Sequence, residues 1–347
     1  MRKLALIFLG VLTLTLTLAL AGCSSRSQAA DALTPRAYTR IANPDTNTVQ
    51  LQIALRKFVS ARHRGPAIWL AAVMHVGEPD YYRALQRFLD TQTVVLYEGI
   101  NPAAHPHHVH EASAASTSAS MLAARSTGTN AGYSMQSMLA RSLGLVFQLE
   151  TIDYDRANFL NSDLSILQIR RIMAGGQHRA SPGQASGTNA SFDTLLQMMD
   201  GSSFLGSLFK LGMQLMASSP ELQAVAKLTL IEAVGRLKGD LSDVQGLPPD
   251  WKQLVKVLIE ARNQNLMADL KAELKKNPSS GSMAVFHGAG HMDDLEKRIT
   301  GDLHYRPADE TWLTAFSVNL RKSGISPAEA QMIRNLIKTQ LDQMQRF

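Results

Sequence analysis

Cysteine is nearly absent from this chain, because Cys23 is the only one among its 347 residues. A single cysteine cannot form an intrachain disulfide, so the hydrophobic core alone has to hold the fold together. A cysteine-ligated metal site and a disulfide-rich scaffold are excluded for the same reason. A cysteine nucleophile is excluded as well, since we expect Cys23 to be acylated, as argued below.

Aromatic residues are also scarce, at 6% of the chain, and lysine and arginine form no run, although the net charge is +6. Proteins that bind nucleic acid concentrate their basic residues on one face, often beside stacking aromatic side chains. We therefore expect no nucleic-acid partner. Long apolar runs are missing after the N-terminus, and a membrane-spanning helix needs about 20 apolar residues.

The N-terminus has the parts of a bacterial lipoprotein signal peptide. Arg2 and Lys3 precede an uncharged apolar stretch from Leu4 to Leu20, and the sequence Leu20-Ala21-Gly22-Cys23 follows. Small residues before a cysteine and a polar stretch after it favour cleavage and lipidation at Cys23 over a transmembrane anchor. The residues directly after Cys23 are Ser24 and Ser25 rather than aspartate, so we expect the lipid to tether the protein to the outer membrane, facing the periplasm.

The rest of the chain is long enough for one large domain. We expect residues 1–22 to be the signal peptide and residues 23–48 to be the lipidated N-terminus with a flexible tether. Residues 49–347 form the domain, with loose, low-complexity insertions near 102–133 and 175–191.

Short apolar runs bounded by glycine and proline predict buried strands, and amphipathic stretches predict helices. The expected strands are 67–73, 93–97, 145–152, 282–286 and 312–318. The expected helices are 80–89, 219–237, 250–275 and 326–345, the last with Ser326 as its N-cap. This order predicts an α/β fold: a central, mostly parallel sheet flanked by helices, with a helical insertion at about 195–276.

Three polar residues follow apolar strands closely: His75, Glu98 and His291. Open α/β sheets place their sites at the carboxyl ends of the strands, so these side chains are expected to meet. Each one alone is more often an ordinary hydrogen-bonded residue or helix cap, and His287 is expected to be a packed residue of its strand. As a set, the two imidazoles and the carboxylate could bind a divalent metal or serve as acid and base.

The stretch AVMHVGEPDYYRALQRFLDTQTVVLYEGI resembles the first motif block of the TraB/GumN (Tiki, PrgY) family, in which Gly-x-x-His ends one strand and Glu ends the next. Gly288–His291 is similar to the second Gly-x-x-His of that family, and Ile259–Lys271 to its Glu-Arg-(Asp/Asn) helix, with Arg262 as the arginine. The segment LGLVFQLETIDYDRANFLNSDLS resembles its middle block, with Asp153 and Asp163 as acidic positions. Ala72 stands where the first motif has glycine.

The resemblance implies a metal-dependent hydrolase that acts on peptides, as Tiki metalloproteases do. His75, Glu98 and His291 would then ligate zinc, manganese or cobalt. Glu98 could instead serve as general base, and Arg262 would hold a substrate carboxylate or stabilise an oxyanion. The expected partners are the membrane, through the N-terminal lipid, and a peptide or small-molecule substrate.

Other interpretations remain open at this point. The wider superfamily contains haem-associated ChaN-like lipoproteins, so a non-catalytic haem- or metal-binding protein is one alternative. A metal-independent hydrolase similar to erythromycin esterase, with histidine as the base, is another. A structural lipoprotein with a decayed site is the third. The cluster His105–His110 is interpreted as a linker rather than a metal-loading segment.

Overall fold

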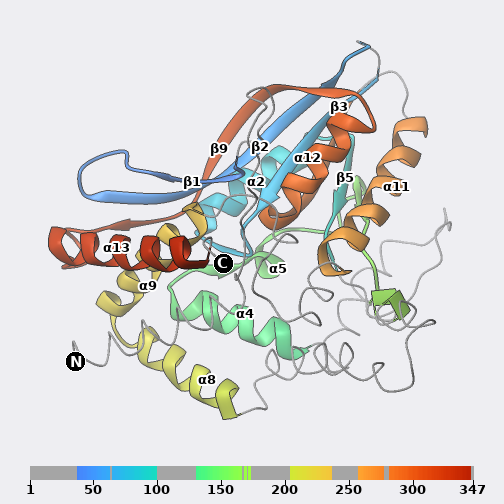
Figure 1. Ribbon diagram of the computed structural model, residues 1–347. Coiled ribbons are helices and arrows are strands. Elements are labelled where there is room, and N and C mark those ends of the chain that lie inside the picture. Colours follow the sequence, from blue (N-terminus) through green and yellow to red (C-terminus); the bar gives the residue numbers. More distant parts are fainter. Residues whose placement is uncertain are drawn as a thin grey trace.

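The computed structural model describes residues 37–62, 65–99, 130–165, 168–169, 171–172, 204–236, 257–276 and 281–344 (Figure 1). The signal peptide, Cys23, the His105–His110 cluster and the insertion near 175–191 lie outside these residues. Within the described ranges, no helix has the length and apolar character needed to cross a bilayer.

The strands are β1 (Thr39–Ala42), β2 (Thr48–Ser60), β3 (Ala67–Val73), β4 (Val76–Gly77), β5 (Val94–Tyr97), β6 (Val146–Phe147), β7 (Phe159–Asn161), β8 (Ser282–Gly288) and β9 (Tyr305–Asn319). The helices are α2 (Pro79–Asp90), α4 (Asn130–Ser142), α5 (Gln148–Thr151), α8 (Phe204–Ala217), α9 (Pro220–Arg236), α11 (Arg262–Lys276), α12 (Met292–Gly301) and α13 (Pro327–Met344). A π-helical turn, η2 (Val257–Ala261), leads into α11, and a 3-10 turn, η3 (Ala289–His291), leads into α12.

The main sheet confirms the predicted α/β class. β3, β8, β5 and β7 lie side by side and parallel, with β8 between β3 and β5. β2 continues the sheet and is antiparallel to its neighbours. It pairs with β1 and β3 along one of its sides and with β9 along the other. The carboxyl ends of β3, β8 and β5 therefore meet at one edge of the sheet, near α5 (Figure 1).

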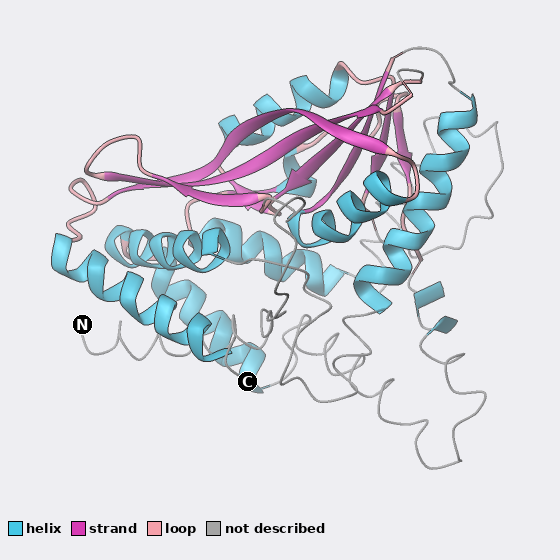
Figure 2. Cartoon of the chain, turned by 45° about the horizontal axis from the view of Figure 1, so that its top comes forward, coloured by secondary structure: helices cyan, strands magenta, loops and turns pink. Residues whose placement is uncertain are grey.

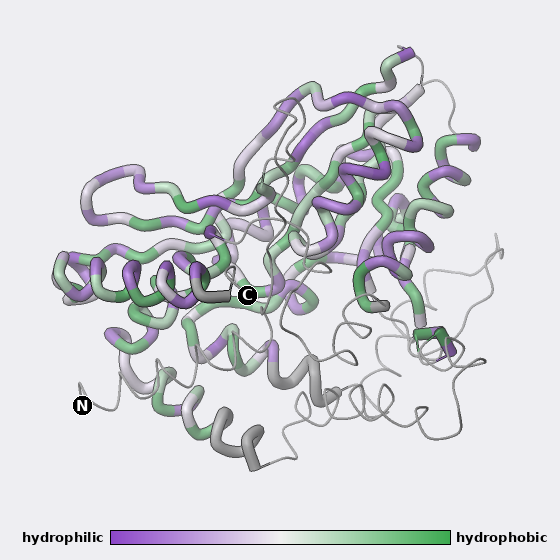
Figure 3. Tube along the Cα trace, viewed as in Figure 1, coloured by the Kyte–Doolittle hydropathy of each residue, from purple (hydrophilic) through white to green (hydrophobic). Residues whose placement is uncertain are grey.

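Helices cover both faces of this sheet (Figure 2). Trp69 of β3 packs edge-on against Phe88 of α2, with ring centroids 5.1 Å apart. Arg56 of β2 reaches the opposite way, to Glu296 of α12. Because successive strand residues point to opposite faces, and Arg56 pairs with Leu70, the residue next to Trp69, α2 and α12 lie on opposite sides of the sheet. The strands between them are mostly apolar (Figure 3), as the predicted two-sided burial requires.

Several predicted elements have the expected bounds. The strand at 67–73 and the strands beginning near 93 and 282 are present as β3, β5 and β8. The capping box before α13 is formed: Glu329 N–H donates to Ser326 Oγ over 3.2 Å, and Ser326 N–H donates to the Glu329 carboxylate over 3.0 Å. The strand expected at 312–318 is the second half of the longer β9.

Two expectations differ from the structure. The run 145–152 was predicted to be a strand, but only Val146 and Phe147 are extended, and α5 follows. The partner strand β4 is only two residues long, so the ladder ends there, and a short apolar run does not distinguish strand from helix by its period. β1, at Thr39–Ala42, also lies within residues 23–48, which were predicted to be the lipidated N-terminus and tether, and it pairs with β2.

Candidate active site

His75 follows β3 directly and is held from the side by Gln148. The backbone N–H of Gln148 donates to the His75 carbonyl over 2.9 Å, and His75 Nδ1 lies 2.8 Å from Gln148 Oε1. With Oε1 of the amide on this side, the contact is the one in which His75 Nδ1 donates, because an amide oxygen only accepts hydrogen bonds. Within the described part of the chain, no hydrogen-bond partner reaches His75 Nε2, and the residue is partly exposed.

Glu98 follows β5 and crosses to β8. Its Oε1 accepts from Arg262 Nη2 over 2.6 Å, and its Oε2 accepts the backbone N–H of Gly288 over 2.7 Å. Gly288 is also where His75 and Glu98 approach each other. A Cβ added to Gly288 would lie 3.2 Å from Glu98 Oε2 and 3.4 Å from His75 Nε2. Both groups therefore face the same point above this glycine.

Arg262 is the first residue of α11, and every N–H of its guanidinium has a partner inside the protein. Nε and Nη2 donate to the two oxygens of Asp163 over 2.7 and 2.6 Å, and Nη2 also donates to Glu98. Nη1 lies 3.4 Å from the Leu258 carbonyl and 3.5 Å from His291 Nε2. Because its five donors are used, Arg262 is an anchor for the two carboxylates and has no N–H left for a substrate.

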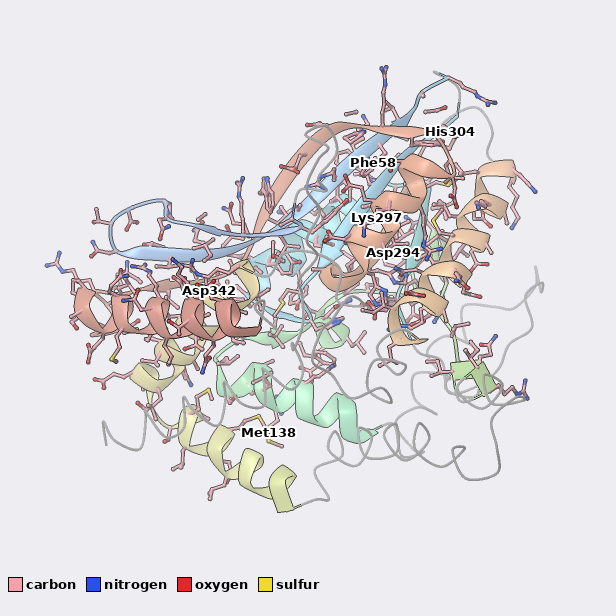
Figure 4. The ribbon with its side chains drawn as sticks, viewed as in Figure 1. Phe58, Met138, Asp294, Lys297, His304 and Asp342 are labelled. Carbon is pink, nitrogen blue, oxygen red and sulfur yellow. The ribbon has the colours of Figure 1, made fainter. Side chains whose placement is uncertain are left out.

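His291 ends the η3 turn, and both of its ring nitrogens are engaged. Asn263 donates its Nδ2 hydrogens to the His291 carbonyl, over 3.3 Å, and to Asp294 (labelled in Figure 4), over 2.8 Å. The other end of this amide, Asn263 Oδ1, lies 2.8 Å from His291 Nδ1. It must therefore accept the hydrogen bond from the imidazole N–H. His291 Nε2 then accepts from Arg262, so His291 is a neutral, fixed ring rather than an open base.

His287 of β8 is fully buried, and among the described residues neither of its ring nitrogens has a hydrogen-bond partner. Its ring lies edge to face with that of His291, with centroids 5.6 Å apart. A buried, unpaired imidazole is unusual because each polar atom loses its hydration without compensation. His287 therefore packs, as predicted, but at an energetic penalty.

Burial and fixed charges set the protonation states here. Burial raises the pKa of Glu98, but the Arg262 guanidinium and the surrounding imidazoles together lower it more, so the net pKa is well below the ordinary value. Burial lowers the pKa of His287 strongly and also lowers that of His291. The site thus contains an ionised glutamate beside the neutral imidazoles of His287 and His291.

The structure brings together His75, Glu98, Arg262 and His291, the four site residues expected within the domain, and it adds Asp163. Asp153, the other acidic position of the resemblance, lies apart and pairs with Arg156 over 3.2 Å. The sequence analysis did not identify Gln148 and Asn263 as site residues. Asn263 could have been found, because it directly follows Arg262 at the (Asp/Asn) position of the motif. Ala72 is buried in regular register with His287, so the strand still delivers His75.

The expected metal ligands do not fit a metal ion in this arrangement. Among the described residues, no three His, Asp, Glu or Cys side chains are placed to hold one. Arg262 Nη2 donates to Glu98 Oε1, the carboxylate oxygen that also lies 3.7 Å from His291 Nε2, so a metal ion held by these two atoms would have to displace the guanidinium. The guanidinium offsets one of the two negative charges of Glu98 and Asp163.

Comparisons of this chain with known protein families, with curated proteins and with solved structures find no match.

Proposed function

We propose that this protein is a hydrolase in which His75 acts as general base on a water molecule, without a metal ion. The observation that carries the proposal is the open Nε2 of His75, which faces Glu98 Oε2 across Gly288. This is the metal-independent alternative considered above. It is favoured over the metal-dependent one because Arg262 already holds Glu98 Oε1, the carboxylate oxygen nearest to His291.

The surrounding charges suit His75 for this role. Glu98, Asp163 and Arg262 form a group of two carboxylates and one guanidinium, joined by contacts of 2.6 Å. Their sum is one negative charge beside His75. A fixed charge of this sign stabilises positive charge that develops on a neighbouring group during a reaction. The same group cannot act as the base itself, because its oxygens already accept charge-assisted hydrogen bonds.

A water molecule beside Gly288 would be within hydrogen-bond reach of both His75 Nε2 and Glu98 Oε2. His75 takes one proton from this water while the oxygen attacks a substrate carbonyl carbon. The carbonyl oxygen becomes an oxyanion, for which we propose the backbone N–H groups of η3, next to Gly288, as the stabilising donors. When the tetrahedral intermediate collapses, His75 returns the proton to the departing oxygen or nitrogen, so the enzyme is regenerated.

An ester or a peptide amide has the carbonyl that this chemistry attacks, which agrees with the predicted peptide substrate. If Cys23 is lipidated as proposed from the sequence, the activity takes place at a bacterial membrane surface, on the periplasmic side of the outer membrane.

The test is hydrolysis of a panel of activated esters and chromogenic peptides by the full chain, with and without exhaustive chelation. We expect activity to survive chelation and to fall at least about 100-fold in His75→Asn, the usual contribution of a general base. His304→Asn is the matched control, because His304 is exposed and lies at the far end of the sheet (Figure 4). Activity that is lost on chelation and restored by zinc, manganese or cobalt would support the metal-dependent hydrolase instead, and full activity in His75→Asn would refute the role of His75.

A further inference from the structure

Among the described residues, Gln148 is the side chain that contacts a ring nitrogen of the proposed base. It opens α5 and is only 2% exposed. Two of its hydrogen bonds go to His75, one from the Gln148 backbone N–H and one at Oε1. A third runs from Nε2 to the hydroxyl of Tyr154 over 2.7 Å. Both ends of the amide are therefore hydrogen-bonded.

Tyr154 is itself held rigidly, so the far end of the amide cannot drift. Its ring packs against Tyr97, Phe159 and Phe286, with centroid distances of 4.9, 6.0 and 6.3 Å. These rings come from three strands of the parallel sheet, and Tyr154 is 5% exposed. Aromatic clusters of this kind gain from edge and offset contacts as well as from burial. The sheet thus positions Gln148 through Tyr154, and Gln148 positions His75.

The position of the imidazole proton decides whether the proposed reaction can occur. A neutral histidine carries its proton on one nitrogen, and only the other nitrogen can accept a proton from water. The open nitrogen of His75 that faces Glu98 is Nε2, so the proton has to be on Nδ1. Histidine in water favours the opposite form, with the proton on Nε2, so the protein has to impose this one.

We propose that Gln148 is a positioning residue that holds the proton of neutral His75 on Nδ1 and so makes Nε2 the basic atom. The inference rests on the function proposed above, because that function makes Nε2 the atom that accepts a proton from water. A neutral amide does this without a charge of its own. The negative charge of the site then lies on the Glu98 side, which is where the water would lie.

The pair formed by Asn263 and His291 provides an internal reference. Asn263 Oδ1 faces His291 Nδ1 at 2.8 Å, the same separation as in the Gln148–His75 pair. Its orientation is fixed independently, because its Nδ2 bonds to a carbonyl and a carboxylate. His291 must therefore have its proton on Nδ1, and its nitrogen signals show what that form looks like in this protein.

The experiment is long-range ¹H–¹⁵N correlation on the full chain, labelled with ¹⁵N-histidine and purified in a mild detergent. Signals are assigned by their loss in His75→Asn and His291→Asn. We expect the His75 and His291 signals to show the same form, with Nδ1 protonated. In Gln148→Leu, the His75 signal should change to the Nε2-protonated form or a mixture, while His291 stays unchanged. Gln148→Glu keeps an acceptor at this position and should preserve the wild-type form.

Activity gives a second readout. We expect Gln148→Leu to lower kcat by about 100-fold or more, as wrong-tautomer variants of a histidine base do, with little change in KM. Gln148→Glu should restore most of the rate, and Gln331→Leu, on the exposed side of α13, should leave it unchanged. If Gln148→Leu does not fold, Gln148→Met takes its place, because methionine has a side chain of similar length without the amide oxygen.

An Nε2-protonated His75 in the wild-type protein overturns the proposal, and so does an unchanged His75 signal in Gln148→Leu. Both results are independent of whether any substrate is hydrolysed. A failure of the hydrolase proposal would appear as missing activity with the expected nitrogen signals, so the two failures are distinguishable.

Discussion

Replacing Gly288 with alanine puts one methyl group where the attacking water is proposed to lie. Its Cβ would be 3.2 Å from Glu98 Oε2 and 3.4 Å from His75 Nε2. The glycine has an ordinary backbone conformation, with φ −53° and ψ 143°, so alanine causes no backbone strain. The methyl therefore acts by occupying space between the two groups.

The expected effects on stability and on activity differ in size. Both contacts are tighter than usual, so the neighbours must shift by a few tenths of an ångström, and such overpacking costs about 1–3 kcal/mol. For activity, a displacement of the reacting groups by about 1 Å is enough to lower a rate about 100-fold. We therefore expect Gly288→Ala to be folded but to lose at least about 100-fold in kcat/KM.

The assay combines ester or peptide hydrolysis with urea unfolding of the same preparation. Gly301→Ala is the matched control: it makes the same chemical change at the end of α12, where an added Cβ meets nothing within 4 Å. That variant should keep full activity and gain up to about 1 kcal/mol, since alanine is the better helix former. Wild-type activity in Gly288→Ala would show that no reacting group lies above Gly288 and would refute the proposed site.

Three further predictions concern the buried arginine and the buried histidines of the site. Arg262→Met should destabilise the fold by about 3–5 kcal/mol in urea unfolding, because Glu98 and Asp163 would be left without their cation; a loss below about 1 kcal/mol would contradict this. His287→Leu should stabilise the protein by about 1–3 kcal/mol at pH 7.5, because it removes two unpaired buried nitrogens, and a destabilised variant would mean that the imidazole has a polar partner. Burial lowers the pKa of His287 and His291, so the unfolded chain binds more protons below its own histidine pKa of about 6.5; stability should be full above that pH and should decrease as the pH falls, less steeply in His287→Leu.

The locations of the main site residues were predictable from local sequence. His75, Glu98 and His291 each follow an apolar run closely, and the ends of parallel strands meet at one edge of the sheet. Arg262 was identified only through resemblance to a family motif, because nothing in its own surroundings on α11 distinguishes it from a surface arginine. The prediction of a strand at 145–152 was wrong because this short apolar run has no period that distinguishes a strand from a helix.

The partners of these residues were not predictable. Asp163 binds Arg262 across 99 positions of sequence, and Gln148 reaches His75 across 73. Spacing and composition give no signal for either pair: Asp163 was named only as an acidic position of the resemblance, and Gln148 lies in the apolar run that was predicted to be a strand. The roles changed accordingly: Arg262, expected to contact substrate, has all its donors engaged inside the protein, and His291, expected as a metal ligand, accepts one of them.

The sequence by itself excluded disulfides, through its single cysteine, and determined the α/β class and the edge at which the polar residues gather. These conclusions follow from composition and hydrophobic period, which are local properties of a chain. Only the tertiary structure decided that a guanidinium stands among the predicted ligands and that two amides fix the two imidazoles. Hydrogen bonds and ion pairs depend on distances of about 3 Å between residues far apart in sequence, and folding alone brings those atoms together.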